Sequence, residues 1–142
     1  MGRILRDVIK GRTVVTMAPD TSVRAAAKAM KANNVGSVVV VEGTTLKGIV
    51  TERDALFKVV AEGLDPDKTP LSAVMTEKVI TVTAEAKLMH ALHIMHDGGF
   101  RHMPVVDGDR PVGIVSIRDA FGDELARFGR ELDRKEAILA VR

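Results

Sequence analysis

The sequence predicts an α/β fold made of two copies of one βαββα unit, packed with pseudo-two-fold symmetry. The main observation is an internal repeat: in a chain of 142 residues, segment 4–55 aligns without a gap on segment 69–120, at an offset of 65. Of the 52 aligned pairs 13 are identical, where composition alone predicts about three or four. Each copy also changes from strand-like to helix-like hydrophobic spacing at the same point.

Each copy begins with a short β-rich run, expected at 14–16 and at 79–81. An amphipathic helix should follow, because apolar residues then recur at i, i+3, i+4 and i+7. These residues are Val23, Ala26, Ala27 and Met30 in the first copy and Leu88, Ala91, Leu92 and Met95 in the second. The helices should end at the pairs 33–34 (Asn-Asn) and 98–99 (Gly-Gly), whose residues tolerate a left-handed conformation.

Two further strands and a second helix complete each copy. The strands are expected at 37–42 and 46–51 and at 103–107 and 111–116, with Gly43 and Gly108 in the turns. The second helix should start just after Thr51 and just after Ser116. The adjacent strands predict a hairpin, and the helix before it favours a parallel, right-handed crossover. Helices then cover one face of each sheet, and the two apolar faces left over should pack together around a cleft.

The repeat sets the expected boundaries: a first domain at 4–64, a second at 69–128 and a helical tail at 129–142. Leucines recur every seven residues in the tail region, at Leu125, Leu132 and Leu139, with Phe128 between them. This pattern is compatible with a dimer interface. It is equally compatible with a helix that folds back onto its own sheet. We expect a homodimer.

Composition excludes several classes of protein. The chain has no cysteine, and its 21 basic and 19 acidic residues are mixed along it, so no basic stripe or aromatic platform for nucleic acid is expected. No apolar run is long enough to span a bilayer, and the expected location is the cytoplasm. No spacing suggests a catalytic cluster, so an enzyme is not expected. His90, His93 and His96 step around a helix, which favours a solvated face over a metal site.

The sharpest motif is a hydroxyl residue followed three positions later by aspartate, as Thr51 and Asp54 and again as Ser116 and Asp119. One interpretation is a capping box, which stabilises a helix start by about 1 kcal/mol. The other is a ligand site, because a short carboxylate facing a cleft can accept hydrogen bonds from a sugar diol. One hydroxyl can serve both roles.

The repeated motif resembles the cystathionine-β-synthase-type (CBS) domain. The resemblance rests on Gly-Ile-Val-Thr-x-x-Asp preceded by Val-Gly-Ser-Val-Val-Val-Val, and on Phe-Arg-His-Met-Pro-Val-Val-Asp followed by Gly-Ile-Val-Ser-x-x-Asp. It covers about 4–127. Tandem CBS domains bind adenosyl ligands, namely AMP, ADP, ATP, NAD or S-adenosylmethionine. The resemblance implies that Asp54 and Asp119 hold the ribose, with Thr51 and Ser116 beside them.

The resemblance also suggests where the rest of the ligand would lie. Adenine is expected against small residues and strand backbone around Gly36, Ser37 and Val38 and around Met103 and Pro104. Candidate phosphate contacts are Arg53, Arg118, Arg101 and His102, since a guanidinium group suits phosphate. The first copy has Gly36 and Ser37 where the second has Arg101 and His102, so the two pockets should not bind alike.

These observations favour a regulatory module that senses an adenine nucleotide through ligand-dependent conformation or self-association. The alternative is a dimerisation or protein-interaction module that works without ligand. The two intact aspartates favour the sensor. In either case an effector protein that the sequence does not identify could receive the signal.

Overall fold

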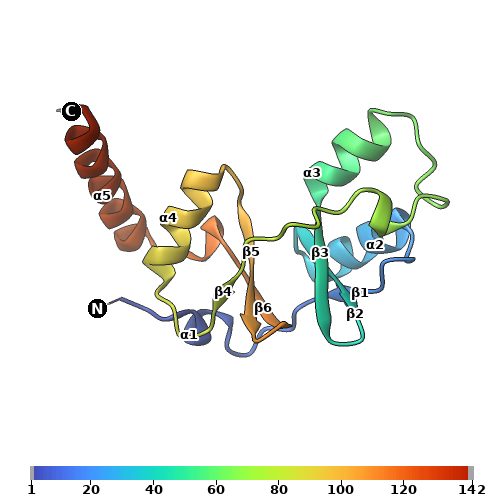
Figure 1. Ribbon diagram of the computed structural model, residues 1–142, viewed down its shortest axis with the longest axis horizontal. Helices are drawn as coiled ribbons and strands as arrows, with labels where there is room; N and C mark the ends of the chain where they lie inside the picture. The colour runs from blue at the N-terminus through green and yellow to red at the C-terminus, as the bar shows by residue number, and fades with distance from the viewer. Residues whose placement is uncertain (1, 141–142) are drawn as a thin grey trace.

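The computed structural model describes residues 2–140, and two three-stranded sheets lie between outer helices (Figure 1). The first sheet has the order β1 (Thr16–Met17), β2 (Ser37–Glu42), β3 (Thr45–Thr51). The second repeats it with β4 (Val82–Thr83), β5 (His102–Asp107) and β6 (Arg110–Ser116). In each sheet the first pair is parallel and the second is an antiparallel hairpin. The predicted α/β fold with two βαββα units is confirmed.

The first strand of each copy begins later than predicted. The expected runs at 14–16 and 79–81 mostly precede β1 and β4, although the Val15 carbonyl does accept a hydrogen bond from the Val39 amide (2.9 Å). The apolar residues of these runs lie beside the surface clefts described below. The apolar β-branched residues of these runs therefore did not show whether the chain pairs with a neighbouring strand or lines a cleft.

The crossover helices are α2 (Val23–Asn33) and α4 (Leu88–Gly98). Both end as predicted in a left-handed residue, Asn34 (φ 52°) and Gly99 (φ 72°). A second helix follows β3 in the first copy as α3 (Glu52–Asp54) and its π-helical continuation η1 (Ala55–Val60).

The second copy departs from this prediction after β6. A short 3₁₀ turn, η3 (Ile117–Asp119), ends in an extended residue, Ala120 (ψ 137°). The long helix α5 (Gly122–Ala140) begins only after that break and runs through the boundary expected at 129. Glu124 accepts a hydrogen bond from the Phe121 amide (2.7 Å), which caps the new helix start.

Each half of the molecule is completed by the segment that precedes the other half in sequence. Helix α1 (Leu5–Ile9) contributes Leu5, Val8 and Ile9 to the core of the second half. In return, Leu71 of the turn η2 (Leu71–Ala73) and Val74, which follows it, lie in the core of the first half. Each hydrophobic core is therefore built from two segments of the chain. The boundaries expected at 4–64 and 69–128 follow the sequence repeat and do not coincide with these cores.

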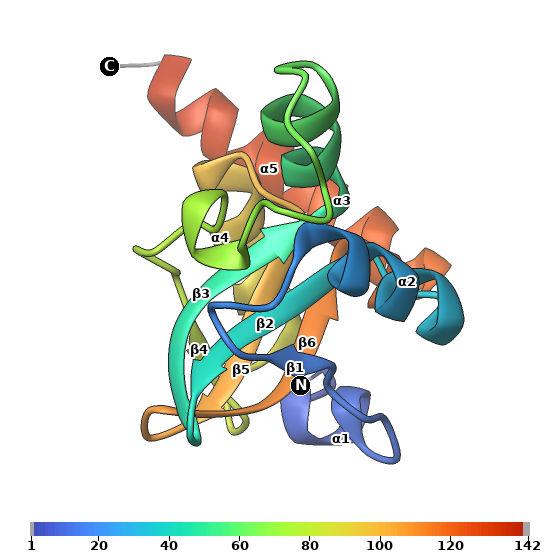
Figure 2. The ribbon, with the colours of Figure 1, turned by 90° about the vertical axis from the view of Figure 1, so that its right-hand side faces the viewer.

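The two hairpins lie one behind the other when the molecule is viewed from its first half (Figure 2). Strands β3 and β6 are in contact, and the Leu46 amide donates a hydrogen bond to the Asp109 carbonyl (2.9 Å). A Cβ on Gly48 would lie 2.7 Å from the Met75 sulfur, and one on Gly113 would lie 2.8 Å from Ile9 Cδ1. The repeated glycine is thus required where a crossing segment presses against each hairpin.

Helix α5 packs on α4 of the same chain. Phe128 is buried, and its ring meets the His93 ring edge-on at 4.8 Å between centroids. Leu132 is partly buried against the same core, but Leu125 and Leu139 are exposed. The heptad pattern therefore does not form one buried face. No helix within residues 2–140 has both the length and the apolar character needed to cross a membrane.

Candidate functional site: two related clefts between the halves

Two surface clefts lie where the two copies meet, and each contains one of the predicted aspartates. The Asp119 cleft has a volume of about 520 Å³ and joins residues 12–15 and 33–37 to His102, Gly113, Ile114, Ser116, Arg118 and Asp119. The Asp54 cleft has a volume of about 380 Å³ and joins Ile49 and residues 51–54 to Thr76, residues 78–80 and residues 99–102. Each volume falls within the range typical of small-molecule sites.

The clefts are related by the sequence repeat. Thr13 and Lys78, 65 residues apart, take equivalent places, and so do Gly36 and Arg101. In both clefts the motif aspartate comes from one copy, and the segment that precedes the first strand comes from the other. A ligand in either cleft would therefore touch both halves.

Asp54 forms the capping box that one of the two interpretations of the motif predicts. Its Oδ2 accepts a hydrogen bond from the Thr51 amide (2.9 Å), and its own amide donates to Thr51 Oγ1 (3.3 Å). Its Oδ1 is paired with Lys58 Nζ at 3.0 Å. Because Asp54 also lines its cleft, capping and ligand binding remain compatible.

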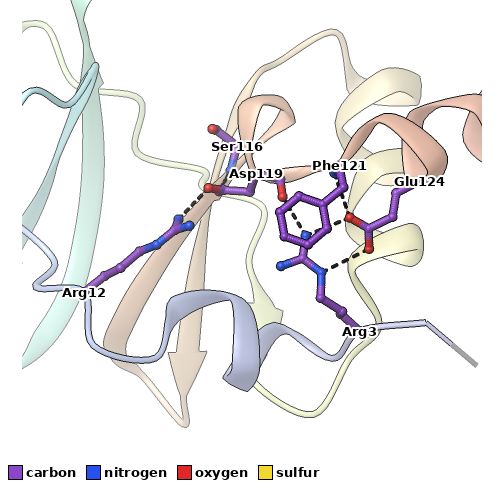
Figure 3. A network of polar contacts seen from close by, with 6 residues as sticks. All are labelled: Arg3, Arg12, Ser116, Asp119, Phe121 and Glu124. Carbon is purple, nitrogen blue, oxygen red and sulfur yellow. Dashed lines mark hydrogen bonds and ion pairs between the residues drawn. The ribbon is translucent and has the colours of Figure 1, made fainter.

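Asp119 is held by two arginines from the N-terminal segment (Figure 3). Its Oδ2 accepts a hydrogen bond from the Ser116 amide (2.7 Å), and its Oδ1 forms an ion pair with Arg12. The Arg3 guanidinium donates to the main-chain carbonyl of Asp119 (2.7 Å). The carboxylate thus enters the cleft with both oxygens already engaged.

Arg3 also connects this site to the start of α5. It pairs with Glu124 (2.7 Å) and lies 3.8 Å from the centre of the Phe121 ring. The hydrogen bond from Arg3 lowers the pKa of Glu124. Since the folded-state pKa is the lower one, this pair stabilises the fold above the ordinary pKa of a glutamate, and the stabilisation is lost as the pH falls further.

His102 lines both clefts. A Cβ built on Gly36 would lie 3.1 Å from His102 Nε2 and 3.2 Å from Glu52 Oε1, so the missing side chain leaves room for the imidazole. Burial lowers the pKa of His102. The charge of Arg118 also lowers this pKa, whereas the charge of Glu52 raises it.

The predicted residues divide between the two clefts. Thr51, Arg53, Asp54 and Arg101 line the Asp54 cleft, and Gly36, Ser37, Ser116, Arg118 and Asp119 line the Asp119 cleft. Val38 and Met103 have no exposed surface and belong to the two cores, and Pro104 is buried beside them. None of the three lines either cleft. The Arg53 guanidinium lies 4.9 Å from the Phe57 ring centre.

Sequence reasoning missed the walls that face the aspartates. These are residues 12–15 in the Asp119 cleft and residues 78–80 in the Asp54 cleft. Residues 14–15 and 79–80 were interpreted as parts of strands, and the two walls lie at equivalent repeat positions. That equivalence could have indicated the two walls, because pseudo-two-fold symmetry places each of these segments beside the aspartate motif of the other copy.

The three helical histidines are placed near α5. His93 Nε2 lies 3.4 Å from Glu131 Oε1, and His96 also faces the Phe128 ring edge-on. Within residues 2–140, no three histidine, aspartate or glutamate side chains gather in a group that could hold a metal ion.

Comparison with known proteins identifies the family. The CBS domain model matches residues 5–61 and 71–122, so the chain belongs to the CBS domain family and carries two such domains. It is similar to the mitochondrial CBS domain-containing protein CBSX3 of Arabidopsis thaliana, with 39% identity over 125 residues, which is 84% of this chain and 61% of that protein. It covers 17% of a second Arabidopsis relative, CBSCBSPB3, at 41% identity over 96 residues. The chain thus spans only part of these relatives.

Solved structures agree with this assignment. The CBS domain protein PAE2072 from Pyrobaculum aerophilum, described as complexed with AMP, superposes with a TM-score of 0.80 at 26% identity, over 90% of this chain and 99% of that one. A CBS-CP12 protein from bloom-forming cyanobacteria, described as hexameric, gives a TM-score of 0.73 at 28% identity, over 82% of this chain and 68% of that one.

Proposed function

We propose that this CBS pair is a regulatory module that binds an adenine nucleotide in the clefts between its halves. The observation that carries the proposal is the composition of each cleft, in which the motif aspartate of one copy faces the pre-strand segment of the other. A ligand bound there links the two halves, so its binding energy can favour one arrangement over another. The AMP complex of PAE2072 supports adenine as the base.

The charge of the clefts supports a ligand with phosphate. Arg12, Arg118 and His102 line the Asp119 cleft, whose one acid is Asp119. Three cationic side chains, Arg53, Lys78 and Arg101, line the Asp54 cleft together with two acids. A ribose diol suits the aspartate, and phosphate suits the guanidinium groups. AMP, ADP, ATP, NAD and S-adenosylmethionine remain the ligands to compare.

A thermal shift experiment tests the proposal. AMP, ADP, ATP, NAD and S-adenosylmethionine are each added at millimolar concentration to protein freed of bound nucleotide by unfolding and refolding. A ligand at about 100 times its dissociation constant stabilises the fold by about 2.7 kcal/mol, which raises the melting temperature by several degrees. GMP is the control. An unchanged melting temperature with all five compounds would favour the ligand-independent interaction module.

We also propose that the module forms a homodimer. The helix after β3 exposes three apolar side chains on one segment, with exposed fractions of 53% for Leu56, 52% for Phe57 and 67% for Val60. Such a patch on a folded surface is typical of a protein interface. The hexameric neighbour supports self-association in this family. Effector proteins, location in the cytoplasm and a non-catalytic role stay predictions.

Light scattering at tens of micromolar tests the dimer. The full-length chain should have the mass of a dimer, and the double substitution Phe57→Glu with Val60→Glu should give a monomer. Leu139→Glu is the control for the tail, since Leu139 is exposed at the far end of α5. If only Leu139→Glu abolishes the dimer, the interface lies in the tail and not on the helix after β3. A monomeric full-length chain would refute the dimer.

A further inference from the structure

Each motif aspartate is paired with a cationic side chain, but only one of these two cations lines the cleft of its aspartate. Lys58, the cation on Asp54, also donates a hydrogen bond to the Val74 carbonyl (2.9 Å), and it does not line the Asp54 cleft. Arg12, the cation on Asp119, lines the Asp119 cleft itself. The repeat position equivalent to Arg12 is Glu77, which cannot pair with Asp54. The arginine on the aspartate is thus specific to one cleft.

The Arg12 contact is the replaceable one at Asp119. The Ser116 amide is fixed to Oδ2 by the main chain, and Arg3 holds the Asp119 carbonyl while it is itself paired with Glu124. Arg12 belongs to the loop before β1, and half of its side chain is exposed (51%), against 12% for Asp119. A ligand that takes the place of Arg12 at Oδ1 therefore breaks this ion pair and leaves the other two contacts of Asp119 intact.

We propose that Arg12 makes the Asp119 cleft selective for adenosine compounds that carry a phosphate. The inference rests on the proposed function, in which the Asp119 carboxylate receives the ribose hydroxyls. A phosphate-free nucleoside takes Oδ1 and leaves Arg12 without an anionic partner. A nucleotide brings a phosphate into the same cleft, so the displaced guanidinium exchanges one anion for another. The same exchange is not available at the Asp54 cleft, because Lys58, the cation paired with Asp54, does not line that cleft.

The test compares adenosine with AMP on the wild type and on Arg12→Ala, using an NMR titration that resolves the two clefts. The Gly113 amide reports the Asp119 cleft, and the Gly99 amide reports the Asp54 cleft. At the Asp119 cleft, Arg12→Ala should bind adenosine about two- to fivefold more tightly, because the competing ion pair is gone. AMP should bind about tenfold more weakly, because a charge-assisted contact is lost. Affinities at the Asp54 cleft should not change.

Arg118→Ala is the matched control, since Arg118 lines the same cleft and does not pair with Asp119. It should weaken AMP without strengthening adenosine. If Arg12→Ala leaves adenosine unchanged or weakens both compounds alike, the selective role of Arg12 is refuted while the nucleotide site stands. If neither compound moves either glycine signal of the wild type, the proposed function fails, and the role of Arg12 fails with it.

Discussion

Substituting alanine for Asp54 or Asp119 should weaken nucleotide binding about ten- to hundredfold in the cleft that contains the substituted residue. Each carboxylate is expected to accept charge-assisted hydrogen bonds from the ribose, and such bonds contribute about 1.5–3 kcal/mol. Isothermal calorimetry on the two variants should show the loss of one class of sites in each, with the other class retained. The effect should be larger than that of any single arginine, because the aspartate is the group that recognises the sugar.

A control is needed because both aspartates also support the fold. Asp54→Ala removes a capping box, which costs about 1 kcal/mol of stability whether or not a ligand binds. Asp123→Ala removes an acid from the first turn of α5 and lies outside both clefts, so it should change stability slightly and affinity not at all. Unchanged affinity and stoichiometry in both aspartate variants would refute the site assignment.

Leu71→Ala should destabilise the protein by about 2–5 kcal/mol, the usual range for a buried leucine. Leu71 lies within the segment 69–128 that was expected to form the second domain, yet its side chain is fully buried in the core of the first half. Urea unfolding measures the change. Because each half depends on a segment next to the other, the transition should remain a single cooperative one.

Leu64→Ala is the matched control for this prediction. Leu64 precedes the same connecting segment, but 47% of its surface is exposed. Its removal should cost about 0.5 kcal/mol or less. Equal stabilities for Leu71→Ala and Leu64→Ala would mean that the connecting segment does not complete the first core.

Much of this fold could be predicted because the chain repeats itself. The turn glycines Gly43 and Gly108 have positive φ angles, and the helix ends at Asn34 and Gly99 are left-handed, as local chemistry requires. The hairpins followed from the same signals. The exchange of leading segments could not be predicted, because Leu5 and Leu71 are apolar in either arrangement, and spacing does not say which core receives them.

The candidate site was predictable in its motif but not in its surroundings. The hydroxyl and acid pair is a common signature of a helix start, so Asp54 and Asp119 could be located from spacing. The partners of Asp119 could not, since Arg3 and Arg12 lie 116 and 107 residues away in the chain. The extended residue Ala120 directly follows Asp119, whose carbonyl accepts a hydrogen bond from Arg3, and local spacing did not predict this break in the helix.

Binding of an adenine nucleotide in the two clefts can be tested by an AMP titration of nucleotide-free protein followed by NMR. We expect saturable shifts with micromolar dissociation constants for amides of both clefts, including Gly113 and Gly99, and little change on the outer face of α4. Absence of any shift at millimolar AMP, or shifts confined to a surface outside the two clefts, would contradict it.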